Sequence, residues 1–346
     1  MKQPFFSIIV PVYNAESSIA TLISEIKEIS GVDFECILIN DGSVDNTEAI
    51  ILESIKTDQR FSTKTIPNNG PGNARNEGLS LANGEYFIFI DADDKFSSTS
   101  LVDYCHLIQD NRDVDLIISS FVIHTMQKGS VINKKDYIIE DKKYQSHNEF
   151  IEGVYGLMNR QLLYVCWNKC YRLDIVRDYG ISFNSYNSCE DRLFNIAYYH
   201  HCSRVITTRK VTYHYYFDGA EGITNKYHDN KFETFKEFYL KTNDLTSNLN
   251  KDGTASLYLK GVTSVVFSIH SEKKLSNKEK RKLIKTISKD ATVIEAKKIS
   301  RTESTTKKVT KFIFRCPYPL LYGATYVGSL VERKLPGVIA LLKRKY

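Results

Sequence analysis

Three carboxylates stand within four positions at the end of an apolar run. The run is YFIFI, residues 86–90, and Asp91, Asp93 and Asp94 follow it with only an alanine between them. Carboxylates this close together repel one another and raise one another's pKa unless a cation lies among them. The cluster therefore indicates a bound metal ion, a bound basic group or a set of helix caps.

The apolar run before this cluster is one of four segments that predict strands in the first half of the chain. These segments are FSIIVPVY (6–13), ECILIND (35–41), FSTKTIP (61–67) and EYFIFIDAD (85–93). The first, second and fourth are almost continuously apolar, which is typical of parallel strands covered on both faces. Segments with helical spacing separate them. This alternation predicts an α/β fold with a doubly wound, mostly parallel, Rossmann-like sheet.

Polar residues at the ends of three of these strands are expected to meet. The first strand ends in PVYN (11–14), the second in NDGS (40–43) and the fourth in DADD (91–94). In doubly wound sheets, ligands bind beyond the carboxyl ends of the strands. The sequence therefore predicts one ligand site built from three distant stretches of chain.

The second half of the chain predicts mixed structure followed by helices. Residues 113–125 and 204–217 read as strands, and residues 191–202 read as a helix that Glu190 and Asp191 open. An acidic first turn complements the helix dipole, so this pair can be purely structural.

Six motifs together resemble the family 2 glycosyltransferases, whose fold is named GT-A. They follow the family's order: SIIVPVYNAE (7–16), LINDGSVDNT (38–47), NNGPGNARNEGL (68–79), FIDADD (89–94), WNKCYR (167–172) and CEDRLFN (189–195). The resemblance implies a catalytic domain over residues 1–225, with a nucleotide-binding half at 1–96 and an acceptor-binding half at 97–225. A helical region at 226–300 and a basic amphipathic tail at 301–346 are expected to follow.

The resemblance implies a nucleotide-sugar donor, with a UDP-sugar as the expected form. Tyr13 offers an aromatic face to the base, and Asp41 can accept a hydrogen bond from the uracil N3–H. Arg75 can reach the nucleotide or its phosphates with a planar pair of donors. The remaining donor-binding positions are Pro11, Asp91, Ala92 and Asp93. Without the family, NDGS reads as an Asx turn before a helix and Arg75 as a surface residue.

The DADD cluster matches the family's DxD motif. A hard divalent cation, Mn²⁺ or Mg²⁺, prefers oxygen ligands and takes some of them from substrate phosphates. Asp93 is the expected direct metal ligand, Asp91 is expected to hold the ribose or a metal-bound water, and Asp94 is expected to cap the next segment. An acidic cap without a metal remains the alternative.

Family position also makes Asp191 the expected catalytic base. Its task would be to take the proton of an acceptor hydroxyl as that oxygen attacks the anomeric carbon with inversion. Weaker candidates for acceptor binding are Trp167, Lys169 and Glu190. An aromatic ring can line a sugar site, but a core position is equally open for the single tryptophan.

One stretch departs from the family pattern. Phe217 and Gly222 stand roughly where relatives have Arg and Ser. Contacts to the diphosphate are then either absent or made by other side chains of this stretch: His214, Tyr215 or Lys226.

Positive charge is concentrated in the tail. Residues 301–346 hold ten of the 47 basic residues but only two of the 41 acidic ones. Residues 1–300 hold the other 37 basic and 39 acidic residues. A nucleic-acid enzyme more often carries its surplus on the main domain, so no nucleic-acid partner is expected.

The segment KKVTKFIFRC predicts an amphipathic helix in this tail. Its apolar positions are Val309, Phe312, Ile313 and Cys316, and its flanking basic positions are Lys307, Lys308, Lys311 and Arg315. Apolar faces with basic flanks suit anionic lipid, which predicts a peripheral enzyme on the cytoplasmic face of the cell membrane. The alternative is a helical layer packed on the catalytic domain or on another subunit of a homo-oligomer.

The cysteines and the hydropathy pattern point to the cytoplasm. The seven cysteines include no CxxC pair, which indicates reduced thiols. The apolar run near the start is too short for a signal-peptide core, and no stretch reaches the roughly 18 apolar residues of a spanning helix.

The expected function is therefore that of an inverting, metal-dependent glycosyltransferase of bacterial cell-surface polysaccharide synthesis, with a glycan or lipid-linked acceptor. One alternative is another nucleotide-sugar enzyme, such as a nucleotidyltransferase. Such an enzyme is expected to carry glycine and lysine in its first loop, which here reads VYNAESS. The other is a non-catalytic binding or scaffold protein of the same fold, which a degraded DxD or Glu-Asp motif would favour. Both motifs are intact.

Overall fold

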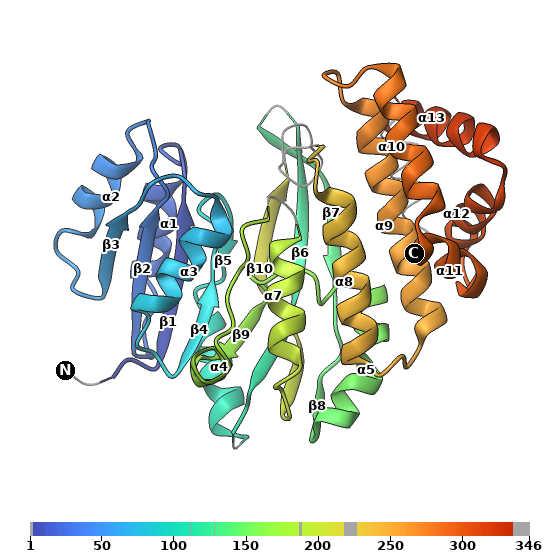
Figure 1. Ribbon diagram of the computed structural model, residues 1–346. Coiled ribbons are helices and arrows are strands. Elements are labelled where there is room, and N and C mark those ends of the chain that lie inside the picture. Colours follow the sequence, from blue (N-terminus) through green and yellow to red (C-terminus); the bar gives the residue numbers. More distant parts are fainter. Residues whose placement is uncertain (1–2, 112, 128, 187–188, 218–226, 335–346) are drawn as a thin grey trace. The chain divides into compact units, whose positions relative to one another are not determined.

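The computed structural model describes residues 3–334 except 112, 128, 187–188 and 218–226 (Figure 1). The chain divides into two compact units. One comprises Met1–Tyr186 with Glu190–Ala220, and the other comprises Asn187–Cys189 with Glu221–Tyr346. The predicted boundary after residue 225 lies outside the described residues, as do Gly222, Lys226 and the end of the basic tail.

The described strands of the first unit form a ten-stranded mixed sheet in the order β3-β2-β1-β4-β9-β6-β10-β5, with β7 beside β6 and β8 beside β10. Their bounds are β1 Phe6–Val12, β2 Phe34–Asn40, β3 Phe61–Thr65, β4 Tyr86–Phe89, β5 Lys95–Phe96, β6 Leu116–Gln127, β7 Ser130–Tyr137, β8 Lys142–Tyr144, β9 Lys169–Arg172 and β10 Val205–Phe217. The strands β3, β2, β1 and β4 pair in parallel, and so do β6 and β10. This confirms the predicted α/β fold with a mostly parallel sheet.

The strand β9 joins the two halves of the sheet. It pairs antiparallel with β4 on one side and with β6 on the other. Its four residues, Lys169–Arg172, are too few for the sequence to show an alternating pattern. This stretch was therefore recognised only as a motif. The strands β5 and β8 are likewise too short to show a pattern, and β7 has mainly polar residues, so none of the three was predicted.

Seven helices are described in the first unit: α1 Ile19–Lys27, α2 Thr47–Ile55, α3 Pro71–Leu81, α4 Ser100–Gln109, α5 His147–Asn159, α6 Leu173–Tyr179 and α7 Glu190–Tyr199. The helix α3 lies unusually close to the sheet. A Cβ on Gly78 would stand 2.3 Å from a methyl group of Ile9 in β1, so only glycine permits this approach. The close packing fixes the position of Arg75, one turn earlier in the same helix.

The second unit is helical, as predicted. Its described helices are α8 Lys231–Leu245, α9 Lys251–Ser271, α10 Asn277–Lys289, α11 Ala291–Ile299, α12 Thr305–Arg315 and α13 Tyr318–Lys334. The helix α9 supplies much of the core, with Leu259, Val262 and Val266 buried against residues of α10, α11 and α13. Within the described residues, no helix combines the length and apolarity that crossing a membrane requires.

The predicted apolar stripe of α12 is divided between surface and interior: Val309 and Phe312 are exposed, whereas Ile313 packs partly against the core. Phe314 and Thr310 face the core, and Lys307 is buried beside Glu303 with a 3.0 Å contact. Val309 and Phe312 are exposed, with 69% of Phe312 accessible. Tertiary packing of α12 on its neighbours, which helical spacing alone does not reveal, buries Phe314 and leaves Val309 and Phe312 exposed.

Candidate active site

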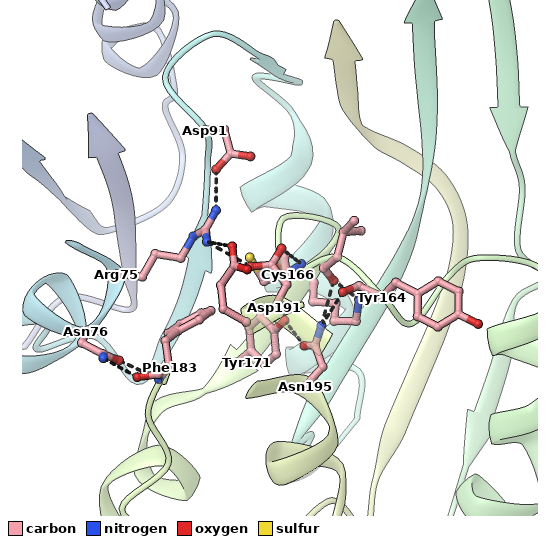
Figure 2. Close-up of polar contacts among 12 residues, drawn as sticks. Arg75, Asn76, Asp91, Tyr164, Cys166, Tyr171, Phe183, Asp191 and Asn195 are labelled. Carbon is pink, nitrogen blue, oxygen red and sulfur yellow. Dashed lines mark hydrogen bonds and ion pairs between the residues drawn. The ribbon is translucent and has the colours of Figure 1, made fainter. Parts of the chain in front are cut away.

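A single buried arginine joins the two acidic clusters. Arg75 of α3 is 5% exposed. Its Nη2 donates to Asp91 Oδ1 and its Nη1 to Asp191 Oδ1, both at 2.9 Å, and Figure 2 shows the guanidinium between the two carboxylates. Glu190 Oε1 lies 3.8 Å from Nη1. Asp91 and Asp191, which are 100 positions apart in the sequence, therefore share one cation.

Three elements bring these groups together. Asp91 follows β4, where its N–H donates to the Tyr213 hydroxyl at 3.0 Å. Glu190 and Asp191 form the first turn of α7. The rings of Phe89 and Phe183 lie 5.9 and 5.5 Å from the guanidinium carbon, so the cation is held between aromatic faces as well as carboxylates.

The cluster carries more negative than positive charge. Burial, with Asp191 adding to it and Arg75 opposing it, raises the pKa of Glu190 to about 7. Burial also raises the pKa of Asp91, although Arg75 acts against that shift. Three carboxyl groups around one guanidinium leave a site that attracts a further cation.

Asp94 fixes the turn that carries Asp91 and Asp93. It is 4% exposed; its Oδ2 accepts from the Tyr213 hydroxyl at 2.8 Å, and its Oδ1 accepts from the Tyr216 N–H at 2.9 Å. Burial, together with the charges of Asp91 and Asp93, raises the pKa of Asp94 to about 9. The expected role of Asp94 as a cap of the next segment is therefore wrong, since its side chain anchors the acidic turn to β10.

The side chain of Asp93 is exposed, whereas that of Ala92 is buried. The Asp93 carboxylate offers the oxygen ligands that a hard divalent cation prefers. It follows Asp91 and precedes Asp94 in the chain, and the pKa values of both of these carboxyl groups are raised. Within the described residues, no group of three or more His, Cys, Asp or Glu side chains is arranged to hold a metal ion. The residues fit a metal whose remaining ligands come from a bound diphosphate or water.

The nucleotide face is predicted at the ends of β1 and β2. Asp41 is 3% exposed, and its two carboxylate oxygens accept from the N–H groups of Asn69 and Gly70, each at 2.9 Å. A Cβ on Gly42 would lie 2.9 Å from the backbone nitrogen of Asn68, which explains the glycine after Asp41. Asp41 therefore fastens the loop before α3, a structural role that the sequence analysis did not predict.

Tyr13 and Pro11 lie at the end of β1 next to this loop. Tyr13 is 51% exposed, so one ring face is accessible to a planar group. Pro11 is partly buried and pairs with Ile39 of β2. The Asp41 N–H donates to Val12 O at 2.8 Å, which holds the two strand ends together.

Two candidates for acceptor binding lie in the core instead. Trp167 is 5% exposed, because its ring stacks on Tyr213 at 4.3 Å and meets the edge of Phe121 at 4.7 Å. Lys169 is completely buried. Neither side chain presents a surface to a sugar, so the predicted acceptor contacts of Trp167 and Lys169 are wrong; Glu190 remains at the site.

The sequence analysis missed several residues that hold the site. Tyr213 of β10 joins Asp91 to Asp94, and the Cys166 N–H donates to Asp191 Oδ2 at 3.4 Å. For Tyr213, the only available signal is the hydroxyl of a tyrosine within a predicted strand. A backbone N–H in an irregular segment leaves no signal at all.

The comparisons with known proteins agree with the motifs. The model of glycosyl transferase family 2 matches residues 7–167. EpsH of Bacillus subtilis (strain 168) is 28% identical over 244 residues, which cover 69% of this chain and 68% of EpsH. The poly(ribitol-phosphate) beta-N-acetylglucosaminyltransferase TarS of Staphylococcus aureus (strain MW2) is 28% identical over 216 residues, which cover 61% of this chain and only 35% of TarS.

A solved structure resembles almost the whole chain. The crystal structure of S. aureus TarS 1–349 in complex with UDP-GlcNAc matches with a TM-score of 0.66 at 19% identity, covering 95% of this chain and 91% of that chain. At this identity the likeness concerns the fold, and it confirms the predicted GT-A fold. The family match and the relatives lead to one conclusion: this chain is a glycosyltransferase, and its residues 7–167 are a family 2 glycosyltransferase region.

Proposed function

We propose that this enzyme transfers a sugar, with inversion, from a UDP-sugar to a hydroxyl group of a glycan or lipid-linked acceptor in the synthesis of a bacterial surface polysaccharide. The observation that supports this most directly is the Arg75 guanidinium, which joins Asp91 at the end of β4 to Asp191 at the start of α7. It places a candidate donor-binding group and a candidate base on either side of one cation.

Asp191 serves as the general base in this proposal. Arg75 and the Cys166 N–H each engage one of its oxygens, which restricts the rotation of the carboxylate. The acceptor oxygen forms a bond to the anomeric carbon as its proton passes to Asp191, and the bond from that carbon to the diphosphate oxygen breaks. The diphosphate leaves with the electron pair, so a single displacement inverts the anomeric centre.

The donor lies along the ends of β1, β2 and β4 in this proposal. Tyr13 stacks on the base, and Asp41 and Pro11 border it, while Arg75, Asp91 and Ala92 line the route to the phosphates. The structural relative TarS 1–349 was crystallised with UDP-GlcNAc and with UDP, which favours a uridine nucleotide here. The named relatives also include a glycosyltransferase of amylovoran biosynthesis, AmsB of Erwinia amylovora, which favours a surface polysaccharide as product.

A divalent cation, Mn²⁺ or Mg²⁺, is the proposed cofactor, and Asp93 is its proposed ligand. When bound, it would neutralise charge on the leaving diphosphate. Hydrolysis of a UDP-sugar that requires Mn²⁺ and stops on chelation would separate this function from a non-catalytic binding role. A chain that binds UDP-sugars but neither transfers nor hydrolyses them would contradict the proposal.

Asp93→Ala is expected to abolish most of the transfer activity and most of the Mn²⁺-dependent binding of UDP. The side chain is exposed, so its loss should leave the fold intact. Titration calorimetry with UDP, with and without Mn²⁺, measures the effect. Asp33→Ala is a matched control, because Asp33 is also an exposed carboxylate and lies just before the start of β2, at the opposite end of that strand. Binding of UDP and Mn²⁺ by Asp93→Ala as in the parent would assign the metal to other residues.

The second unit is proposed to bind the cytoplasmic face of the membrane. The helices α12 and α13 expose several large apolar side chains: Val309, Phe312, Leu320, Tyr326 and Val327. Lys308 and Arg315 are exposed on α12 beside Phe312, and the sequence of α13 has no charged residue from Tyr318 to Val331. Apolar side chains flanked by cations fit an anionic lipid surface, where each basic residue adds about 1 kcal/mol of attraction.

Phe312→Glu and Leu320→Glu are each expected to lower cosedimentation with liposomes of anionic lipid by about tenfold, since each removes a large side chain from the interface. Both side chains are more than 60% exposed, so the fold should tolerate the change. Leu240→Glu is the matched control on α8 of the same unit, where Leu240 is 49% exposed. Equal binding to neutral vesicles, or a loss of self-association in place of lipid binding, would favour an interface between copies of this chain.

A further inference from the structure

Five consecutive backbone carbonyl groups between α5 and β9 are all bound by buried side chains. This stretch, the 162–166 segment, runs from Leu162 to Cys166 without regular secondary structure. The donors are Asn168, Lys169, Tyr171, Asn195 and Tyr199, all of which are fully buried. Irregular backbone is normally placed at the surface, because its polar groups need partners. Here the protein provides a dedicated set of partners.

Lys169 donates three hydrogen bonds in and beside this segment. Its Nζ donates to Leu162 O at 3.2 Å, to Asn168 Oδ1 at 2.7 Å and to Val165 O. An ammonium group has three N–H donors, and here each of them meets an oxygen of a neutral group. Burial lowers the pKa of Lys169 to about 7, while the charge of the nearby Asp191 acts in the opposite direction. The cation is thus neither a surface group nor half of an ordinary ion pair.

One face of α7 holds the other side of the segment. Asp191, Asn195 and Tyr199 are spaced by four residues, so they lie in a row along the helix. The Tyr199 hydroxyl donates to Leu163 O at 3.1 Å, and Asn195 Nδ2 donates to Val165 O at 3.1 Å. The Cys166 N–H then reaches Asp191 Oδ2 at 3.4 Å (Figure 2). The segment runs along the helix and ends at the carboxylate.

Asn195 is itself oriented by β9. Its Oδ1 accepts from the Tyr171 hydroxyl at 2.7 Å, and the same hydroxyl lies 3.3 Å from Cys166 O. The amide nitrogen must therefore face the carbonyl groups of the segment. Lys169 and Tyr171 of β9 act on the segment from one side and α7 from the other.

We propose that Lys169 is a positioning residue of the transferase: it fastens the 162–166 segment to β9, so that the Cys166 N–H and the face of α7 hold the Asp191 carboxylate in place for proton transfer. This inference rests on the proposed role of Asp191 as the base. It replaces the acceptor contact that the sequence suggested for Lys169.

Lys169→Met keeps the unbranched stem and removes all three donors. We expect kcat at saturating donor and acceptor to fall about 10- to 100-fold, because small displacements of a catalytic group are costly. The KM for the donor and the Kd for UDP should stay within about threefold, because the change affects the chemical step and not ground-state binding. In the Asp191→Asn background, Lys169→Met should lower kcat little further, because both changes act on one carboxylate.

A milder pair of variants covers the case in which Lys169→Met does not fold. Tyr171→Phe removes the hydroxyl that contacts Asn195 and Cys166, and Tyr86→Phe removes an equally buried hydroxyl that donates to Val114 O at 2.9 Å away from the segment. We expect Tyr171→Phe to lower kcat and Tyr86→Phe to leave it unchanged at a similar loss of thermal stability. An unchanged kcat in both Lys169→Met and Tyr171→Phe, or a full further loss in the Asp191→Asn background, would overturn the inference. If the unsubstituted chain neither transfers a sugar nor hydrolyses a UDP-sugar, the proposed function is wrong, and this inference falls with it.

Discussion

Asp191→Asn should lower kcat by about 10²–10⁴-fold while the affinity for UDP barely changes. Loss of one positioned general base typically has this cost. Asparagine keeps the shape, and its Oδ1 can still accept from Arg75, but its Nδ2 cannot accept from the Cys166 N–H, so the site loses one charge and the 3.4 Å contact to that N–H. Steady-state kinetics at saturating donor, together with calorimetric titration of UDP, would measure both quantities.

Glu190→Gln is the matched control for this prediction. Glu190 lies in the same turn of α7, but its nearest approach to Arg75 is 3.8 Å, against 2.9 Å for Asp191. We expect the smaller effect from Glu190→Gln. If Glu190→Gln instead lowers kcat more than Asp191→Asn does, the base is Glu190. An Asp191→Asn variant with a kcat within a few-fold of the parent would lead to the same reassignment.

Arg75→Leu should lower the free energy of unfolding of the first unit by about 3–5 kcal/mol at neutral pH, because it leaves the partly buried Asp91 and Asp191 without their cation. Activity should be lost with it. Urea denaturation followed by tryptophan fluorescence is a suitable measurement, since the single tryptophan, Trp167, is buried in this unit. Arg204→Leu is the control: Arg204 pairs with Asp113 at 2.6 Å at an exposed position, where such pairs contribute less than about 1 kcal/mol.

The loss of stability caused by Arg75→Leu should depend on pH. In the parent, burial raises the pKa of Asp91 and brings that of Glu190 to about 7, and Arg75 opposes both shifts. Without Arg75 the folded-state pKa values move further above their unfolded values. A carboxyl group whose pKa rises on folding stabilises the fold below its unfolded pKa, and this contribution is lost as pH rises through the folded pKa. The free energy of unfolding of the variant should therefore be closest to that of the parent at about pH 4–5, and the difference should grow towards neutral pH. A difference in stability that does not depend on pH would contradict the charge argument.

The sequence predicted the arrangement of the first half of the sheet because its strands are apolar and long enough to show it. Once β1, β2 and β4 are parallel neighbours, their polar ends must lie at one edge, and this follows without any knowledge of side-chain contacts. That Asp91 and Asp191 share Arg75 could not be predicted, because the contact depends on how closely α3 packs on the sheet. The glycine that permits this packing, Gly78, reads in sequence as an ordinary weak helix residue.

Side chains were misread where residue type was used as a guide to exposure. Lys169 and Trp167 suggested sugar contacts because they are charged and aromatic, but Lys169 of β9 and Trp167, just before that strand, both lie in the interior. Asp94 was read as a cap because it precedes a new segment, and its actual partners, Tyr213 and Tyr216, lie more than one hundred positions away. Burial of a polar residue depends on tertiary partners, which no local pattern encodes.

The position of β9 has a consequence for synthesis of the chain on the ribosome. The strand β4 ends at Phe89, but its antiparallel neighbour β9 begins only at Lys169, which is 80 positions later. At typical translation rates that interval lasts about 4–16 s. Throughout it, one edge of an almost wholly apolar strand, Tyr86–Phe89, has no strand to pair with and resembles the edges from which sheets aggregate. Nascent chains halted between these two points therefore carry an unpaired apolar edge that the complete chain covers with β9.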